Sequence, residues 1–158
     1  MDETYIKVKG KWVYLYRAVD KEGNTVDFML SEHRDEPAAR AFFEKGTGSS
    51  GIPDKLNMDK SGANKAGIDT INLQLALLFM MEGLFLQINV RQVKYLNNIV
   101  EQDHRFIKKI TKQMKGFKAF HSADATLSGI KLHHMLKKGQ HTQSDNQTIF
   151  EQFYGLAA

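Results

Sequence analysis

The chain has 158 residues, of which 42% are hydrophobic and 25% are charged, as is normal for one globular domain. It contains no cysteine, so disulfides and thiolate metal sites are excluded, and its charged opening MDETYIK is not a secretory signal. The net charge of +4 is uneven: residues 91–140 hold eleven Lys or Arg against three acids, whereas residues 1–90 hold eleven against thirteen. This division suits a protein that binds polyphosphate with one part and divalent metal with another, although an ordinary basic surface is the alternative.

The first third of the chain predicts an antiparallel meander of three strands. Its segments are alternating or rich in aromatic and β-branched residues, and Gly10-Lys11 and Gly23-Asn24 supply turns between them. The expected strands are residues 5–9, 12–19 and 25–30. Pro37 then favours the first turn of a helix over residues 38–45.

Residues 46–51, GTGSSG, match the letters of a dinucleotide-binding loop. Such a loop must follow a strand and open a helix, so that helix amides meet the pyrophosphate. Here the glycines follow a predicted helix and run into Ile52-Pro53. We therefore discount the motif and expect a flexible connection.

The remaining elements alternate between strand and helix. The expected strands are residues 55–59 and 85–93, and the expected helices begin near residues 64, 97 and 122. The apolar run 73–86 is too short to span a bilayer and predicts a buried helix or a subunit interface. Three antiparallel strands followed by helix, strand, helix, strand and helix predict an α/β ribonuclease-H-like fold, with a five-stranded mixed sheet flanked by helices. We assign it to residues 1–140 and expect residues 141–158 to be a poorly ordered tail.

The helix expected from about residue 97 has two chemically opposite faces. Its apolar stripe is Leu96, Ile99, Val100, Phe106, Ile107 and Ile110. Its polar face is Glu101, His104, Arg105 and Lys108, which recur at steps of three, four and seven. On spacing alone, a solvated surface is the simpler interpretation of that polar face. Asp103 falls within the apolar stripe and needs a hydrogen-bonding partner there.

The same stretch, VKYLNNIVEQDHRFIKK, together with MKGFKAFHSADATLSGIKLHHMLKKGQ, resembles the end of bacterial insertion-sequence transposases of the DDE type, closest to the group called family six. DETYIKVKGKWVYLYRAVD and MDKSGANKAGID resemble that family's other two acidic segments, in the same order. The resemblance covers nearly the whole chain. It independently implies the ribonuclease-H-like, retroviral-integrase-like fold.

The resemblance implies a catalytic and metal-binding triad of Asp2, Asp59 and Glu101. It also implies Mg²⁺, with Mn²⁺ as a substitute, because two hard cations about 3.5–4 Å apart can activate a hydroxyl and neutralise the phosphate during strand cleavage and transfer. Asp2 and Asp59 would converge if their strands are neighbours, and Glu101 would close the group from the following helix. The expected DNA-binding residues are Lys108, Arg105, His104, Asn97 and Lys94.

The resemblance further implies transposon ends and target DNA as partners, and a homodimer or higher synaptic oligomer. It implies a bacterial cytoplasmic, nucleoid-associated protein, without membrane association. Family members carry an upstream helix-turn-helix region that this chain lacks, and the first strand begins next to Asp2. The alternative to an active catalytic core is therefore a truncated, inactive remnant that still binds DNA non-specifically and self-associates.

Overall fold

The computed structural model describes residues 1–83, 85–93, 97–141 and 147–157. Its first element is the predicted antiparallel meander, built from β1 (Asp2–Val8), β2 (Lys11–Val19) and β3 (Thr25–Ser31) in that spatial order. Lys9 and Gly10 form the first turn, both with positive φ, which is the backbone of a two-residue hairpin turn. This turn places Tyr5 opposite Tyr14, and Lys7 opposite Trp12.

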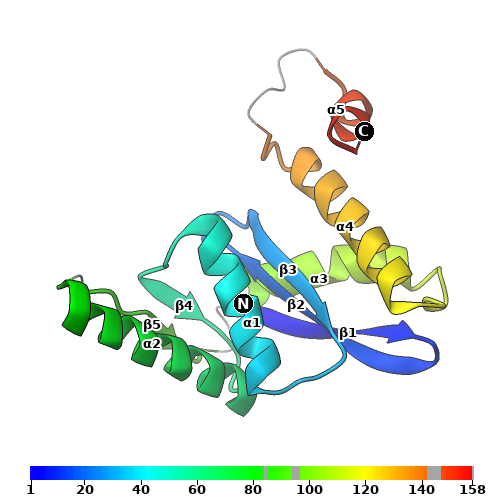
Figure 1. The fold of residues 1–158 in the computed structure, drawn as a ribbon. Helices are drawn as coiled ribbons and strands as arrows, with labels where there is room; N and C mark the ends of the chain where they lie inside the picture. The colour runs from blue at the N-terminus through cyan, green and yellow to red at the C-terminus, as the bar shows by residue number, and fades with distance from the viewer. Residues whose placement is uncertain (84, 94–96, 142–146, 158) are drawn as a thin grey trace.

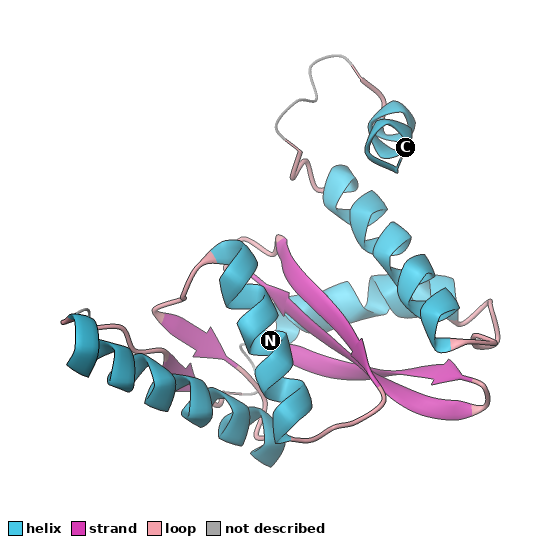
Figure 2. Cartoon of the chain, in the orientation of Figure 1, coloured by secondary structure: helices cyan, strands magenta, loops and turns pink. Residues whose placement is uncertain are grey.

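The meander has an apolar core on each face, because successive side chains of β2 point to opposite sides. Val13 and Leu15 join one core, with Ile107 of α3 (Asn98–Thr111) and Leu127 of α4 (Phe120–Lys137). Tyr16 joins the other, which also contains side chains of the helices α1 (Glu36–Ser50) and α2 (Gly62–Glu82). Figure 2 shows the strands between these two groups of helices.

Helix α1 (Glu36–Ser50) begins at Asp35, whose side chain accepts a hydrogen bond from the Ala38 amide at 3.0 Å, with Pro37 in the first turn. The helix continues through residues 46–50. Our prediction of a flexible connection was wrong there, because a glycine weakens an established helix without ending it when hydrogen bonds continue. The Gly51 amide still donates to Thr47 O at 2.9 Å, and Gly51 ends the helix with a positive φ.

Helix α2 (Gly62–Glu82) packs on α1 with its first half and leaves the core with its second. At Gly67 an added Cβ would come within 3.0 Å of the Ala39 side chain and the Arg40 backbone, so glycine permits the close approach. Beyond Leu75 the helix is largely exposed, and Met80 and Met81 are 80% and 81% exposed. The buried-helix alternative for run 73–86 was therefore wrong for most of its described residues, and the subunit-interface alternative remains.

The fourth and fifth strands, β4 (Lys55–Asn57) and β5 (Asn89–Arg91), form a parallel pair of their own. The five predicted strands are thus all present, although they are hydrogen-bonded as two sheets. The two sheets meet where the Met1 amino group donates to Asn57 O at 2.6 Å.

The last helix, α5 (Ile149–Ala157), lies within the segment that we expected to be a poorly ordered tail. Thr148 and Glu151 explain it, because they form the reciprocal cap of a helix start: the Thr148 amide donates to Glu151 Oε2 at 2.7 Å, and the Glu151 amide to Thr148 Oγ1 at 3.3 Å. The ring of Phe153 lies 6.4 Å from that of His133 on α4. Within the described residues, no helix is both long and apolar enough to cross a membrane.

Candidate metal centre

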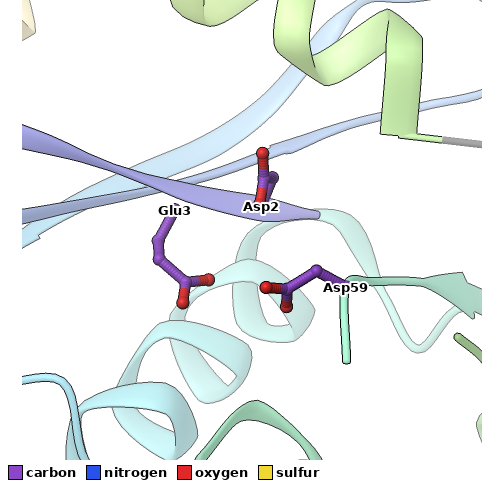
Figure 3. Close-up of side chains that lie close together, drawn as sticks. All are labelled: Asp2, Glu3 and Asp59. Atoms are coloured by element: carbon purple, nitrogen blue, oxygen red, sulfur yellow. The ribbon is translucent and has the colours of Figure 1, made fainter. Parts of the chain in front are cut away.

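Three carboxylates from distant parts of the chain meet where β1 begins and β4 ends. Asp2 and Glu3 are the first two residues of β1, and Asp59 follows β4 by two residues. One oxygen of each lies within 4.8 Å of the others (Figure 3). The structure therefore brings the two expected aspartates together and adds Glu3, which the sequence analysis missed. Asp2 and Glu3 point to opposite faces of β1, as strand alternation requires, and Asp59 reaches both of them from the loop after β4.

Glu3 is already bound by the protein. Its buried carboxylate accepts hydrogen bonds from Arg34 Nε at 2.5 Å and from Asn64 Nδ2 at 2.8 Å. The same Asn64 amide lies 3.3 Å from Asp59 Oδ1, and Arg34 lies 3.8 Å from Asp59 Oδ2. Asn64 is buried in the first turn of α2, so this helix orients Asp59 relative to Glu3. Glu3 thus suits a positioning role better than a ligand role.

Asp2 faces the other way, toward α3. Its carboxylate is 19% exposed, and its Oδ2 lies 3.7 Å from His104 Nε2. Burial, together with the nearby charges of Glu3 and Asp59, raises the pKa of Asp2 to about 6. A cation beside Asp2 and Asp59 would relieve this repulsion.

His104 lies inside the protein, so our prediction that it is on an exposed polar face was wrong. It is 4% exposed, because α3 turns this position toward the start of β1. Burial and the positive charges of Arg17 and Lys108 lower the pKa of His104 to about 4, so the ring is neutral at neutral pH. Neither ring nitrogen has a hydrogen-bond partner among the described residues. A neutral imidazole with an unpaired nitrogen facing a carboxylate can accept a water molecule or an ion.

The other expected site residues lie on or before α3. Glu101 is half-buried, one helical turn before His104, and is not part of the three-carboxylate group within the described chain. Arg105 and Lys108 are exposed, as a phosphate-binding role requires. Asn97 is only 4% exposed, which corrects its expected place on the DNA-facing surface. The fifth residue, Lys94, lies outside the described residues.

Asp103 has the partners that its buried position requires. It forms an ion pair with the guanidinium of Arg17, a fully buried side chain on β2. Lys138, just beyond α4, donates to Asp103 Oδ1 at 2.6 Å and to Gly23 O at 2.6 Å. Burial alone would raise the pKa of Asp103, but the hydrogen bond from Lys138 and the charge of Arg17 outweigh burial and lower it. Asp103 therefore joins α3 to β2 and to the end of α4.

The donor set at the start of β1 fits a hard divalent cation. Asp2 and Asp59 offer carboxylate oxygens, the ligand type that Mg²⁺ and Mn²⁺ prefer, and the neutral His104 adds no opposing charge. Burial first, and then the charges of Glu3 and Asp59, raise the pKa of Asp2, and a bound cation would offset both effects. Carboxylates that can hold hard divalent cations are the kind of site found in metal-dependent nucleases and polymerases.

Comparison with known proteins gives the same class. A family model described as a DDE domain matches residues 1–140, and the chain belongs to this family of transposase domains. It is 37% identical over 139 residues to the transposase for insertion sequence-like element IS431mec of Staphylococcus aureus. The transposase for insertion sequence element IS257 in transposon Tn4003, also from Staphylococcus aureus, matches equally well. These matches cover 87% of this chain, which spans 57% of the length of either relative.

A solved structure supports the fold. A chain of the simian T-cell lymphotropic virus intasome, in complex with PP2A regulatory subunit B56 gamma, superposes with a TM-score of 0.58. The match covers 96% of this chain and 52% of that chain, at 15% sequence identity. The likeness confirms the predicted ribonuclease-H-like, integrase-like fold.

Proposed function

We propose that this chain is the catalytic part of an insertion-sequence transposase that cleaves DNA and transfers the cut strand. The observation that carries the proposal is the meeting of Asp2 and Asp59, from separate strands, in a chain that belongs to the DDE family. Asp2, Asp59 and Glu101 would hold Mg²⁺, or Mn²⁺ in its place. These cations polarise the phosphate and activate the attacking hydroxyl when bound.

The protein's own contribution would be to orient these ligands and bind DNA. Asn64 and Arg34 fix Asp59 and Glu3 through the contacts at 2.5–3.8 Å. Glu101 lies on the same helix as His104, one turn nearer the N-terminal end, and His104 contacts Asp2. In the proposed active form, Glu101 supplies the third carboxylate to Asp2 and Asp59 from α3. The exposed Arg105 and Lys108 would contact DNA phosphates near the cut. The protein would act on DNA at the nucleoid of a bacterial cell.

Self-association is part of the proposal. The second half of α2 exposes an uncharged apolar surface made of Leu73, Leu77, Leu78, Phe79, Met80 and Met81, with Phe85 beyond it. No charged residue lies between Asp69 and Glu82, so two copies can meet there without burying a charge. A homodimer through α2 would bring two catalytic centres to two transposon ends.

The proposal is tested with a nicking assay on supercoiled DNA in Mn²⁺, together with calorimetry of Mn²⁺ binding. Glu101→Gln should abolish nicking and weaken metal binding, because it removes one anionic ligand. Glu44→Gln is the matched control, since Glu44 is an exposed acid on α1 whose ion-pair partner in the described part of the chain is Arg40 at 3.6 Å. Metal binding that is unchanged in Glu101→Gln would contradict the assignment of Glu101.

The inactive remnant is the second candidate, and the position of Glu101 outside the three-carboxylate group favours it. A remnant would retard DNA in a gel without cutting it at any Mn²⁺ concentration. Nicking that depends on Asp59 and Glu101 would eliminate this candidate.

A further inference from the structure

A groove of about 760 Å³ lies along the edge of β1, between the β1–β2 hairpin and the C-terminal turns of α3. Its hairpin side carries Tyr5, Trp12 and Tyr14 on one face of the two strands. Figure 1 shows the hairpin extending beyond α1, which leaves this part of the sheet uncovered. Trp12 is 63% exposed and Tyr5 47%, which is unusual for large aromatic side chains in a sheet.

Two of the three rings lie in contact with each other. The rings of Tyr5 and Tyr14 are 5.3 Å apart, and Trp12 follows on the same face of β2, opposite Lys7. The Lys7 ammonium lies 5.9 Å from the centre of the Trp12 ring. Such a row of rings offers flat faces to flat ligands, and every nucleobase has a π-face that stacks on an aromatic ring.

The wall of the groove across the edge of β1 is basic, because α3 packs on the other face of the sheet from the rings. Lys108 and Lys112 come from α3, and Lys115 from the turn that follows it. With Lys7 they make four cations, and no acid is among the described residues that line the groove. Aromatic rings beside a row of ammonium groups are the recognition chemistry of single-stranded nucleic acid, in which bases stack and phosphates pair.

The groove leads to the metal centre along a single strand. Tyr5 follows Glu3 by two residues on the same face of β1, a distance of about 7 Å at the usual rise per residue. A DNA strand with its phosphate at Asp2 and Asp59 therefore has the aromatic row within reach of its next nucleotides. Bases in a duplex already stack on each other, so only unpaired bases can stack on these rings.

We propose that the groove formed by Tyr5, Trp12 and Tyr14 with Lys108, Lys112 and Lys115 binds unpaired nucleotides of the DNA strand that enters the metal centre. The inference deepens the proposed function, on which it rests for the identity of the strand. The binding itself needs no metal, so it is measured in EDTA, independently of cleavage.

The chain has a single tryptophan, Trp12, so intrinsic fluorescence reports directly on this groove. A ten-nucleotide oligothymidine should quench that fluorescence saturably, whereas a blunt duplex of equal length should quench it less. In fluorescence anisotropy with labelled oligothymidine, Trp12→Ala should lower the affinity at least about fivefold, because one stacked base is lost. Trp12→Phe should restore most of the affinity, and the duplex affinity should change less than twofold in both variants.

Phe150→Ala is the matched aromatic control, because Phe150 is 71% exposed on α5, and it should change neither affinity. Two results would overturn the inference: oligothymidine that binds without quenching Trp12, or an equal loss of single-strand and duplex affinity in Trp12→Ala. Polyglutamate that competes as strongly as oligothymidine would also overturn the inference, because the groove would then recognise negative charge alone. If binding behaves as expected and nicking is absent, the proposed function fails and the groove stands. If nicking occurs but oligothymidine does not quench Trp12, the proposed function stands and the inference about the groove fails.

Discussion

Asp103 is the residue on which the joint between α3, β2 and α4 depends. Its carboxylate is 5% exposed and pairs with the fully buried Arg17 and with Lys138. Asp103→Asn should lower the free energy of unfolding by about 3–5 kcal/mol, because Arg17 would stay buried without a counter-charge. Asp124→Asn, an exposed substitution on α4, should change it by less than about 0.5 kcal/mol. Urea unfolding followed by circular dichroism measures both, and equal effects would contradict a buried charge network.

The pH dependence of stability should show two separate regions. The pKa of Asp103 is lowered in the folded protein, so its stabilisation is present above the ordinary value of 3.8 and is lost as the pH falls below it. His134 affects the free energy of unfolding at higher pH than Asp103 does. It stacks on Phe106 at 4.0 Å, and burial, with the charges of Lys138 and Arg17, lowers its pKa to about 4.

Between pH 6.5 and about 4, the unfolded chain therefore binds a proton at His134 that the folded chain does not. As the pH is lowered through this window, the contribution of His134 to the free energy of unfolding should fall by up to about 1.4 kcal/mol per pH unit. His134→Gln should reduce that slope, whereas His33→Gln, at an exposed position, should leave it unchanged. Urea midpoints at several pH values give the slopes, and identical slopes for all three proteins would show that His134 titrates normally when folded.

At the scale of elements, periodicity and turn residues predicted most of the fold. Alternation located β1 to β3, and steps of three and four located α3. What local pattern could not supply was long-range contact. The partners of Asp103 come from residues 86 and 35 positions away, and His104 is buried because β1 lies against it. The two aspartates could be expected to meet from strand order, but the place of Glu101 relative to them depends on how α3 packs.

Helix α2 shows that one sequence pattern can fit two different structural roles. Its run of apolar residues predicted burial or an interface equally well, and only the fold shows that α1 is too short to cover it. If the exposed end is the dimer interface, Met80→Glu with Met81→Glu should convert dimers to monomers, because each charge would be buried unpaired. Ala66→Glu, exposed in the first half of the same helix, should leave the dimer intact. Sedimentation velocity decides, and a wild-type protein that is monomeric at every concentration would contradict the interface.

At the scale of the whole molecule, charge and chemistry divide along the chain. The acidic centre is built from residues 2, 3 and 59, in the part with a slight excess of acids. Apart from Arg91 on β5 and Lys138 just beyond α4, the described basic residues of 91–140 lie on α3, on α4 or between them. The net charge of +8 of this segment can be read directly from the sequence. The groove beside β1 could not be read from the sequence. Its rings come from β1 and β2, whereas Lys108, Lys112 and Lys115 come from a segment about a hundred residues later.

Duplex binding by this basic segment should come mainly from counterion release, because phosphate contacts carry no sequence information. The logarithm of the association constant should then fall linearly with the logarithm of salt concentration, with a slope near −0.9 per phosphate neutralised. Lys108→Ala should shrink that slope by about one unit on every sequence, whereas Lys21→Ala, whose side chain is 89% exposed on the β2–β3 turn, should not. In EDTA, Glu101→Gln should bind equally or slightly more tightly, because it removes a negative charge from the same helix. A fluorescence-anisotropy salt titration on two unrelated duplexes measures all of these slopes. A strong preference for one duplex, or a slope indifferent to Lys108, would place the DNA on another surface.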